Sequence, residues 1–268
     1  MIETEEKKTL LVADPHIGWE IALQQKGIHV PSQTPKILNK LILLLEEYKP
    51  KELVILGDVK YTVVSSELGE WHDVPDFFEK LRAFIGDVAV VRGNHDANIE
   101  PLLPENVRLL PAAGEVIGDV GVFHGHKWPS PGLLGCKTLV MGHLHPVVVF
   151  RDPAGFKLSR QTWIRASCDS EALAKILLKK HNVKVEGSVA ETLLRHYGVH
   201  LEAQELFIMP SFNDFLGGRP VNEARSREKG VESLIGPVLR SEAVDVDDAE
   251  VFLLDGTYLG RLNQLRSL

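Results

Sequence analysis

The sequence predicts an α/β protein whose sheet begins with parallel strands. Several short β-rich runs each end in a cluster of polar residues, and helical patterns separate the first three runs. Continuous aliphatic runs of this length are typical of strands buried on both faces of a central sheet. The 268 residues are 44% hydrophobic and 25% charged, as in an ordinary globular protein. Since no long linker or low-complexity tract interrupts the chain, we expect a single domain over residues 1–268.

The first part of the chain alternates strands and helices. Strands are expected at 9–16, 52–58 and 88–96, and helices at 35–48 and 75–85. Each helix is expected to begin with a proline, Pro35 after Thr34 and Pro75 after Asp73, which suits a first helical turn. Strand, helix, strand, helix and strand in this order predict right-handed crossovers between parallel strands.

After residue 107 the pattern becomes strand-rich. Further strands are expected at 120–126 and 138–145, and hairpins at 116–123 about Gly118-Asp119 and at 251–262 about Asp255-Gly256. A helical insertion at about 170–198 breaks this rhythm. Its second helix carries a capping box, Ser188 with Glu191, and a stop at Gly198.

Charge and cysteine content narrow the function classes. The formal net charge of −7 excludes a strongly basic surface over the whole protein, although a local basic groove stays open. Cys136 and Cys168 are too few for a disulfide framework, which favours a reducing compartment. The N-terminal segment resembles neither a signal peptide nor a membrane span, so we expect a cytoplasmic protein without a membrane partner.

The polar clusters that end the strands are the candidate site. They are rich in carboxylate and imidazole groups: Asp14 and His16; Asp58; Asn94, His95 and Asp96; His124 and His126; His143 and His145. Strands of one sheet that run in a common direction would bring these clusters to one edge. In an extended chain His143 and His145 would also point to the same side. A turn, a cap or a structural histidine explains each cluster alone, but five successive strand ends predict a site.

The residue types predict a metal centre. Carboxylate, imidazole and amide oxygen ligands suit divalent ions such as Mn, Fe, Zn, Co or Ni. The candidate ligands are too many for one ion. Two ions about 3.5–4 Å apart, sharing one carboxylate, are used for in-line displacement at phosphorus. We therefore expect the protein to bind two divalent ions and to catalyse a reaction at phosphorus. Mn is the first candidate for these ions, and Mg is also a candidate.

The motifs resemble those of a known family. Five motifs of this chain resemble, in the same order, the motifs of calcineurin-like metallophosphoesterases. They are Asp14-x-His16-x-Gly18, Gly57-Asp58, Gly93-Asn94-His95-Asp96, His124-Gly125 and Gly142-His143-x-His145. Residues 10–31 and 209–218 resemble the ICC-like branch of predicted phosphoesterases, which is associated with DNA ligase or helicase repair systems. The resemblance implies a four-layer α-β-β-α sandwich of two mixed sheets with a small helical insertion.

The resemblance also implies the ligands of each ion. The first ion would be held by Asp14, His16, Asp58 and His145, and the second by Asp58, Asn94, His124 and His143. One motif departs from the family, because Tyr61 stands where GDxxD has its second aspartate. That departure leaves the orientation of the ligands and the metal preference open. Lys60, beside it, is expected to be exposed rather than near a substrate phosphate.

The resemblance further implies a mechanism. A hydroxide bridging the two ions would attack phosphorus in line, His95 would assist the leaving oxygen, and Asp96 would orient His95 or raise its pKa. His126 could contact phosphate or hydrogen-bond its own loop. Asn213 and Arg219 could contact substrate, or their stretch could pack beneath the site.

The function expected from these residues is metal-dependent hydrolysis of phosphoesters. A phosphodiesterase or nuclease linked to DNA repair is favoured, and a phosphomonoesterase acting on a small metabolite or a non-catalytic metal-binding scaffold is the alternative. The expected partner is a phosphoester, nucleic acid or nucleotide included, while a repair protein or a second copy stays open. A nucleotide-driven enzyme is disfavoured because residues 132–138, GLLGCKT, lack phosphate-loop spacing.

Overall fold

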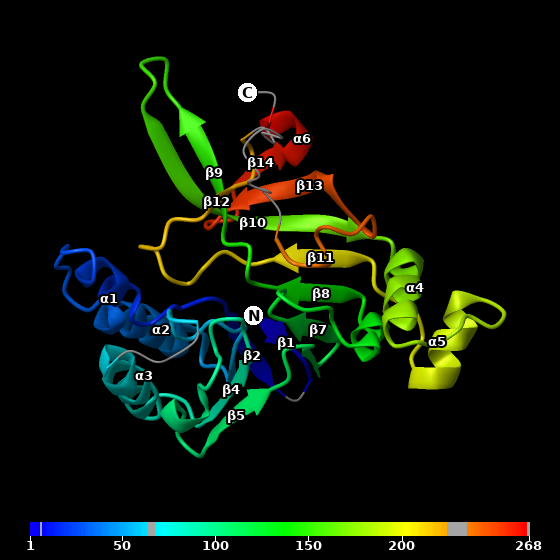
Figure 1. Cartoon of the computed structure of the whole chain (residues 1–268), viewed down its shortest axis with the longest axis horizontal. Coiled ribbons are helices and arrows are strands. Elements are labelled where there is room, and N and C mark those ends of the chain that lie inside the picture. Colours follow the sequence, from blue (N-terminus) through cyan, green and yellow to red (C-terminus); the bar gives the residue numbers. More distant parts are fainter. Residues whose placement is uncertain (6, 64–67, 224–234, 267–268) are drawn as a thin grey trace. The chain divides into compact units, whose positions relative to one another are not determined.

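The chain contains two compact units. The computed structural model describes residues 1–5, 7–63, 68–223 and 235–266. One unit spans Met1–Ala112 and the other Ala113–Leu268, and each contains one mixed sheet with helices (Figure 1). The expected α/β class with two mixed sheets is confirmed.

The first unit is built on a five-stranded sheet. Its strands, in spatial order, are β1 (Ile2–Glu3), β2 (Lys8–Val12), β3 (Glu52–Ile55), β4 (Asp87–Val91) and β5 (Val107–Leu110). Only β1 is antiparallel to its neighbour, so the predicted parallel start is confirmed. Every residue of β3 is buried, as expected for a central strand of a parallel sheet.

In the part of this unit that the structure describes, three α-helices and one 3-10 helix accompany the sheet. They are α1 (Trp19–Gln24), α2 (Thr34–Tyr48), α3 (Leu68–Leu81) and η1 (Glu100–Leu102), and α2 and α3 lie side by side (Figure 1). Helix α2 is confirmed. The predicted start of α3 is wrong, because the helix begins at Leu68 and Pro75 lies inside it. A proline removes the hydrogen bond to the carbonyl four residues earlier. That residue, Trp71, is half exposed, so water can satisfy its carbonyl.

The second unit is built on a nine-stranded mixed sheet. Its strands are β6 (Glu115–Ile117), β7 (Val120–Phe123), β8 (Thr138–Met141), β9 (Pro146–Arg151), β10 (Lys157–Cys168), β11 (Glu205–Ile208), β12 (Arg219–Pro220), β13 (Val244–Leu253) and β14 (Tyr258–Arg261). The spatial order is β12-β9-β10-β11-β8-β7-β6, with β13 paired to β10 and β14 to β13. Strands β7, β8 and β11 are mutually parallel.

Both predicted hairpins are confirmed. Ile117 pairs with Val120 across the two-residue turn Gly118-Asp119. The β13–β14 hairpin turns at Asp255-Gly256, where Gly256 has a φ of 86°. A positive φ at this point is the reason that a glycine suits the turn.

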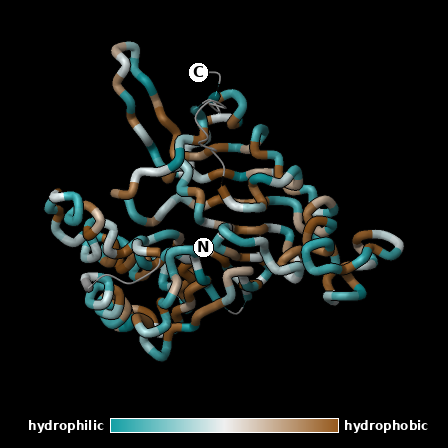
Figure 2. Tube along the Cα trace, in the orientation of Figure 1, coloured by the Kyte–Doolittle hydropathy of each residue, from teal (hydrophilic) through white to brown (hydrophobic). Residues whose placement is uncertain are grey.

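The predicted helices of residues 170–198 pack into the core of the second unit. Helix α4 spans Ser170–Lys180 and α5 spans Val189–Tyr197, and the predicted capping box at Ser188 is formed. In Figure 2 hydrophobic and hydrophilic residues alternate along both helices. The buried ones, among them Leu173, Leu177 and Leu193, join the core of the sheet. Among its described residues the unit also contains two short helices, η2 (Pro131–Gly135) and α6 (Leu262–Leu265).

The five polar clusters follow the carboxyl ends of their strands, but they divide between two sheets. Those after β2, β3 and β4 belong to the first sheet, and those after β7 and β8 belong to the second. The expectation that one sheet gathers all five was wrong. The hydrophobic pattern of a strand indicates that it is buried, but not which distant strand it pairs with.

Candidate metal centre

The loops after β2 and β3 are bonded to each other beyond the ends of the strands. The amide of Asp14 donates to the carbonyl of Gly57 (3.2 Å), and the amide of His16 donates to the carbonyl of Asp58 (2.9 Å). The amide of Ile17 donates to the carbonyl of Val59 (2.7 Å). This ladder fixes Asp14 and His16 beside Asp58.

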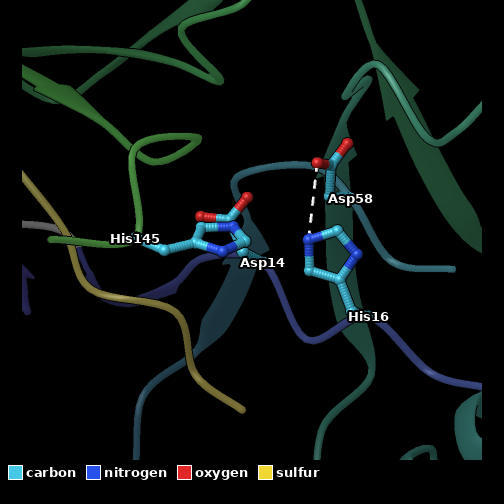
Figure 3. A group of neighbouring side chains, drawn as sticks. All are labelled: Asp14, His16, Asp58 and His145. Atoms are coloured by element: carbon cyan, nitrogen blue, oxygen red, sulfur yellow. Dashed lines mark ion pairs between the residues drawn. The ribbon is translucent and has the colours of Figure 1, made fainter. Parts of the chain in front are cut away.

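The three side chains form a buried cluster in the first unit. Ligand atoms of Asp14, His16 and Asp58 lie within 4.8 Å of one another, and all three residues are buried. Figure 3 shows the ring of His16 directed at the carboxylate of Asp58, with Nε2 3.5 Å from Oδ2. Two buried carboxylates at this separation repel each other unless a cation lies between them. The donor set therefore fits a divalent metal ion.

The backbone at these positions is in the left-handed region. Asp14, His16 and Asp58 have φ values of 55°, 45° and 51°, and His143 and His145 in the second unit have 68° and 49°. Residues other than glycine adopt this region at a cost of about 1–3 kcal/mol, and such residues concentrate at functional sites. The strain at five of the predicted ligands supports their selection for chemistry rather than for stability.

Asp96 fixes the loop after β4 to the loop after β3. Its buried carboxylate accepts the amides of Asp58, Val59 and Gly93, each at 2.8 Å. The amide of His95 donates in turn to Oδ1 of Asp58 (2.8 Å). These bonds hold Asp58 by its backbone and by one oxygen. Asn94 lies in the same loop and is partly buried.

His95 is the accessible imidazole of this edge. Its side chain is 22% exposed, whereas that of His16 is 3% exposed. The two rings meet edge to face with centroids 4.7 Å apart. The Nδ1 atom of His95 is hydrogen-bonded to the carbonyl oxygen of Tyr61. A backbone carbonyl is therefore one support of the ring, and the role of Asp96 toward His95 stays a prediction.

Two buried charged residues of this unit differ from the sequence analysis, since the environment of Lys60 was predicted wrongly and Glu70 was not identified. Lys60 is fully buried, so the expected exposed lysine is wrong, and its ammonium donates to the carbonyl of Thr62. Burial lowers the pKa of Lys60, and the charges of Glu70, Asp96 and Asp58 oppose that shift. Glu70 is one of four acidic residues on α3 and belongs to no motif, so no local pattern distinguishes it.

The second unit contributes a cluster of imidazoles. The ring centroid of His124 lies 4.9 Å from that of His143 and 5.1 Å from that of His126. His126 and His143 are 6.1 Å apart, so all three rings share one small volume. His145, also drawn in Figure 3, follows in the same loop. Ligand atoms of His124 and His143 lie within 4.8 Å of each other, which suits metal coordination.

The predicted extended conformation of the two final histidines was wrong. Strand β8 ends at Met141, and both His143 and His145 have left-handed backbones rather than extended ones. Gly125 permits the close approach of this loop, because a Cβ at Gly125 would lie 2.4 Å from Cε of Met141. The same Cβ would lie 3.2 Å from Cβ of His143.

The stretch after β11 is held rigidly. Asn213 is fully buried, and its Oδ1 accepts the amide of Phe215 (3.0 Å). Gln161 donates from Nε2 to the carbonyls of Ser211 (3.0 Å) and Asn213 (3.2 Å). Arg219 begins β12. A substrate contact by Asn213 or Arg219 stays a prediction.

Neither cysteine is suited to nucleophilic chemistry. Burial raises the pKa of Cys168 to about 11, and the charge of Asp169 adds to this. Burial also raises the pKa of Cys136, with a smaller contribution from Asp119. Since the thiolate is the reactive form, both side chains are inert near neutral pH.

No helix in the described ranges combines the length and the apolar character needed to cross a membrane.

Each unit thus contains a cluster of side chains that could hold a metal ion, acidic in the first unit and rich in histidine in the second. The family model of calcineurin-like phosphoesterases matches residues 7–201. The chain belongs to this family, whose members bind a divalent dimetal centre, and it is a hydrolase acting on phosphoester bonds. The predicted family is confirmed, and the ICC-like branch stays a prediction.

The solved structures that are similar to this chain have low sequence identity to it. A nuclease MPE from Pseudomonas putida is 20% identical, with 91% of this chain and 84% of that chain covered and a TM-score of 0.49. The phosphoesterase YfcE from E. coli is 14% identical, with 94% and 97% covered and a TM-score of 0.38. The protein AQ665 of unknown function from Aquifex aeolicus is 20% identical, with 51% and 78% covered and a TM-score of 0.36. No curated protein sequence matches the chain.

Proposed function

We propose that this chain is a phosphodiesterase, with nucleic acid among its substrates, that works with two divalent cations. The buried cluster of Asp14, His16 and Asp58 is the observation on which the proposal depends, because it concentrates negative charge that a cation would neutralise. The imidazoles of the second unit would supply the remaining ligands. One cation would be held by Asp14, His16, Asp58 and His145, and the other by Asp58, Asn94, His124 and His143.

Manganese is the first candidate for both positions, since carboxylate, amide and imidazole donors suit it. When bound, the cations would lower the pKa of a water molecule and neutralise charge on the phosphoryl oxygens. The cytoplasmic location and the link to DNA repair belong to the same proposal.

The protein itself would contribute a proton donor, the side chain of His95, for the leaving oxygen. His95 is partly exposed and lies beside Asp58, with its Nδ1 engaged by Tyr61. Because a carbonyl can only accept, Nδ1 keeps its proton, so the doubly protonated ring would donate the second proton, on Nε2, to the leaving oxygen and would be left neutral. The variant His95→Ala should keep both cations and lose most of the turnover.

A diester fits the surrounding charges better than a monoester. Two cationic side chains of the motif loops are engaged within the protein, Lys60 by the carbonyl of Thr62 and Arg92 by Glu100. A phosphomonoester carries up to two negative charges near neutral pH, whereas a diester carries one. A diester therefore requires fewer cationic side chains around its phosphate.

The test is a substrate panel with the manganese-loaded protein. The panel contains an aryl phosphodiester, an aryl phosphomonoester, cyclic nucleotides, and single- and double-stranded DNA and RNA, and chelator-treated protein is the control. We expect hydrolysis of diesters that is lost on chelation. Faster hydrolysis of monoesters would overturn the assignment to diesters, and inert protein at full metal content would favour the scaffold.

A further inference from the structure

Glu70 is a fully buried carboxylate in the first turn of α3, outside every motif. We propose that Glu70 is a positioning residue for His95, acting through the backbone of Tyr61 and Thr62. This inference rests on the proposed function, which gives His95 its proton-donating role. Each step lies within the first unit.

The first step is the contact between Glu70 and the loop after Asp58. Oε1 of Glu70 accepts the amides of Tyr61 (3.0 Å) and Thr62 (2.8 Å), and Oε2 accepts the hydroxyl of Thr62. The carboxylate thus binds two consecutive residues, Oε1 both of them and Oε2 Thr62 alone. Hydrogen bonds to an ionised acceptor are about twice as strong as neutral ones, so the loop is firmly held.

The second step is the packing that keeps Glu70 in place. Gly18, with a φ of 87°, lies so close that a Cβ there would be 2.7 Å from Cγ of Glu70. A Cβ at Gly69 would be 2.5 Å from Cδ1 of Ile21. The glycine of the first motif therefore leaves room for the Glu70 side chain, and Gly69 lets α3 approach Ile21 of α1 closely.

The third step leads from the loop to His95. The carbonyl of Tyr61, whose own amide is held by Glu70 and by the carbonyl of Ile17 (3.0 Å), accepts from Nδ1 of His95. The ring of Tyr61 also lies near those of His95 and His16, with centroids 5.9 Å and 5.8 Å away. A shift of this peptide would turn the His95 ring and misdirect Nε2. Proton transfer requires the donor and the acceptor to lie at hydrogen-bond distance and angle, so even a small displacement of the ring lowers its rate.

The experiment compares three substitutions at Glu70 with a control on the same helix. Glu70→Ala removes all three contacts, and Glu70→Asp keeps the charge but shortens the side chain. Glu70→Gln keeps an oxygen for both amides and an NH₂ group for the Thr62 hydroxyl. The control is Glu79→Ala, since Glu79 is exposed and forms an ion pair with Arg82.

We expect kcat on the aryl diester to fall about 10–100-fold in Glu70→Ala and Glu70→Asp, with KM and metal content near the wild-type values. Glu70→Gln should restore most of kcat, and Glu79→Ala should leave it unchanged. In a His95→Ala background, Glu70→Ala should cause no further loss. An equal further loss in that background, or a loss of metal instead of kcat, would overturn the positioning role.

A second readout does not require activity. The Thr62 amide proton and the Nδ1 proton of His95 should shift in the NMR spectra of Glu70→Ala and Glu70→Asp, but not in that of Glu79→Ala. Unmoved signals would overturn this inference even if the enzyme is active. A wild type that is inert on every ester would overturn the proposed function alone, and Glu70→Asp serves if Glu70→Ala does not fold.

Discussion

Gly93 shows how a single residue without a side chain shapes the site. A Cβ at this position would lie 2.2 Å from Oδ1 of Asp58 and 2.3 Å from its backbone nitrogen. Neither distance is tolerable, so Gly93→Ala must displace Asp58 or its loop. We expect the affinity for manganese to fall about tenfold or more in this variant, as measured by calorimetric titration.

Gly86→Ala is the matched control, because a Cβ at Gly86 meets nothing within 4 Å. It should bind manganese like the wild type. Unchanged affinity in Gly93→Ala would show that Asp58 does not take part in metal binding.

At the scale of residues, the sequence supplied the motif side chains but not their supports. Asp14, His16 and Asp58 could be chosen because each follows a strand, and the structure brings them together. Every residue has a backbone carbonyl, so the contact of the Tyr61 carbonyl with His95 could not be predicted from the residue type. Lys60 and Glu70 look like ordinary surface residues in sequence, and their burial arises from the folding of a distant loop and helix onto them.

Helix ends show which elements a sequence specifies by itself. The start of α5 was predictable because the Ser188 hydroxyl and the Glu191 carboxylate satisfy local amides, a contact made within four residues. The start of α3 was not, since Pro75 suits a first turn but lies inside this helix. The sequence therefore predicts the start of a helix only where nearby side chains bond the free backbone amides of its first turn.

A buried carboxylate links the strands of the first sheet at its opposite end. Glu52, at the start of β3, is 1% exposed and accepts the hydroxyl of Thr9 (2.7 Å). Lys7 (2.8 Å) and Arg108 (2.6 Å) form ion pairs with it. Burial alone would raise the pKa of Glu52, but the bonds from Lys7, Thr9 and Arg108 together lower it below 4.5.

This lowered pKa predicts how stability depends on pH. Because the folded-state pKa lies below the unfolded value, the carboxylate stabilises the protein above about pH 4.5, and the contribution disappears as the pH falls through the folded-state pKa. Glu52→Gln should reduce the free energy of unfolding by about 1.5–3 kcal/mol near neutral pH and by less in acid. Urea unfolding at several pH values measures this, with the exposed Glu47→Gln as control. A difference that grows toward low pH would contradict the assignment.

At the scale of the whole molecule, the strand pattern revealed the α/β class, while the division into two sheets required long-range information. The two hairpins were predictable because their turns are local. The pairing of β11 with β8 was not, because β11 follows β8 only after two further strands and two helices. The order of the five motifs identified the family more securely than any strand assignment.

The central claim is that the motif side chains hold two cations that share Asp58. The most direct test is the metal content per chain of manganese-loaded, dialysed protein, measured by mass spectrometry for the wild type, Asp58→Asn and the control Asp76→Asn on α3. The account predicts two ions per chain in the wild type and the control, and fewer than one in Asp58→Asn. Wild-type protein that retains no ion, or Asp58→Asn that retains both, would contradict it.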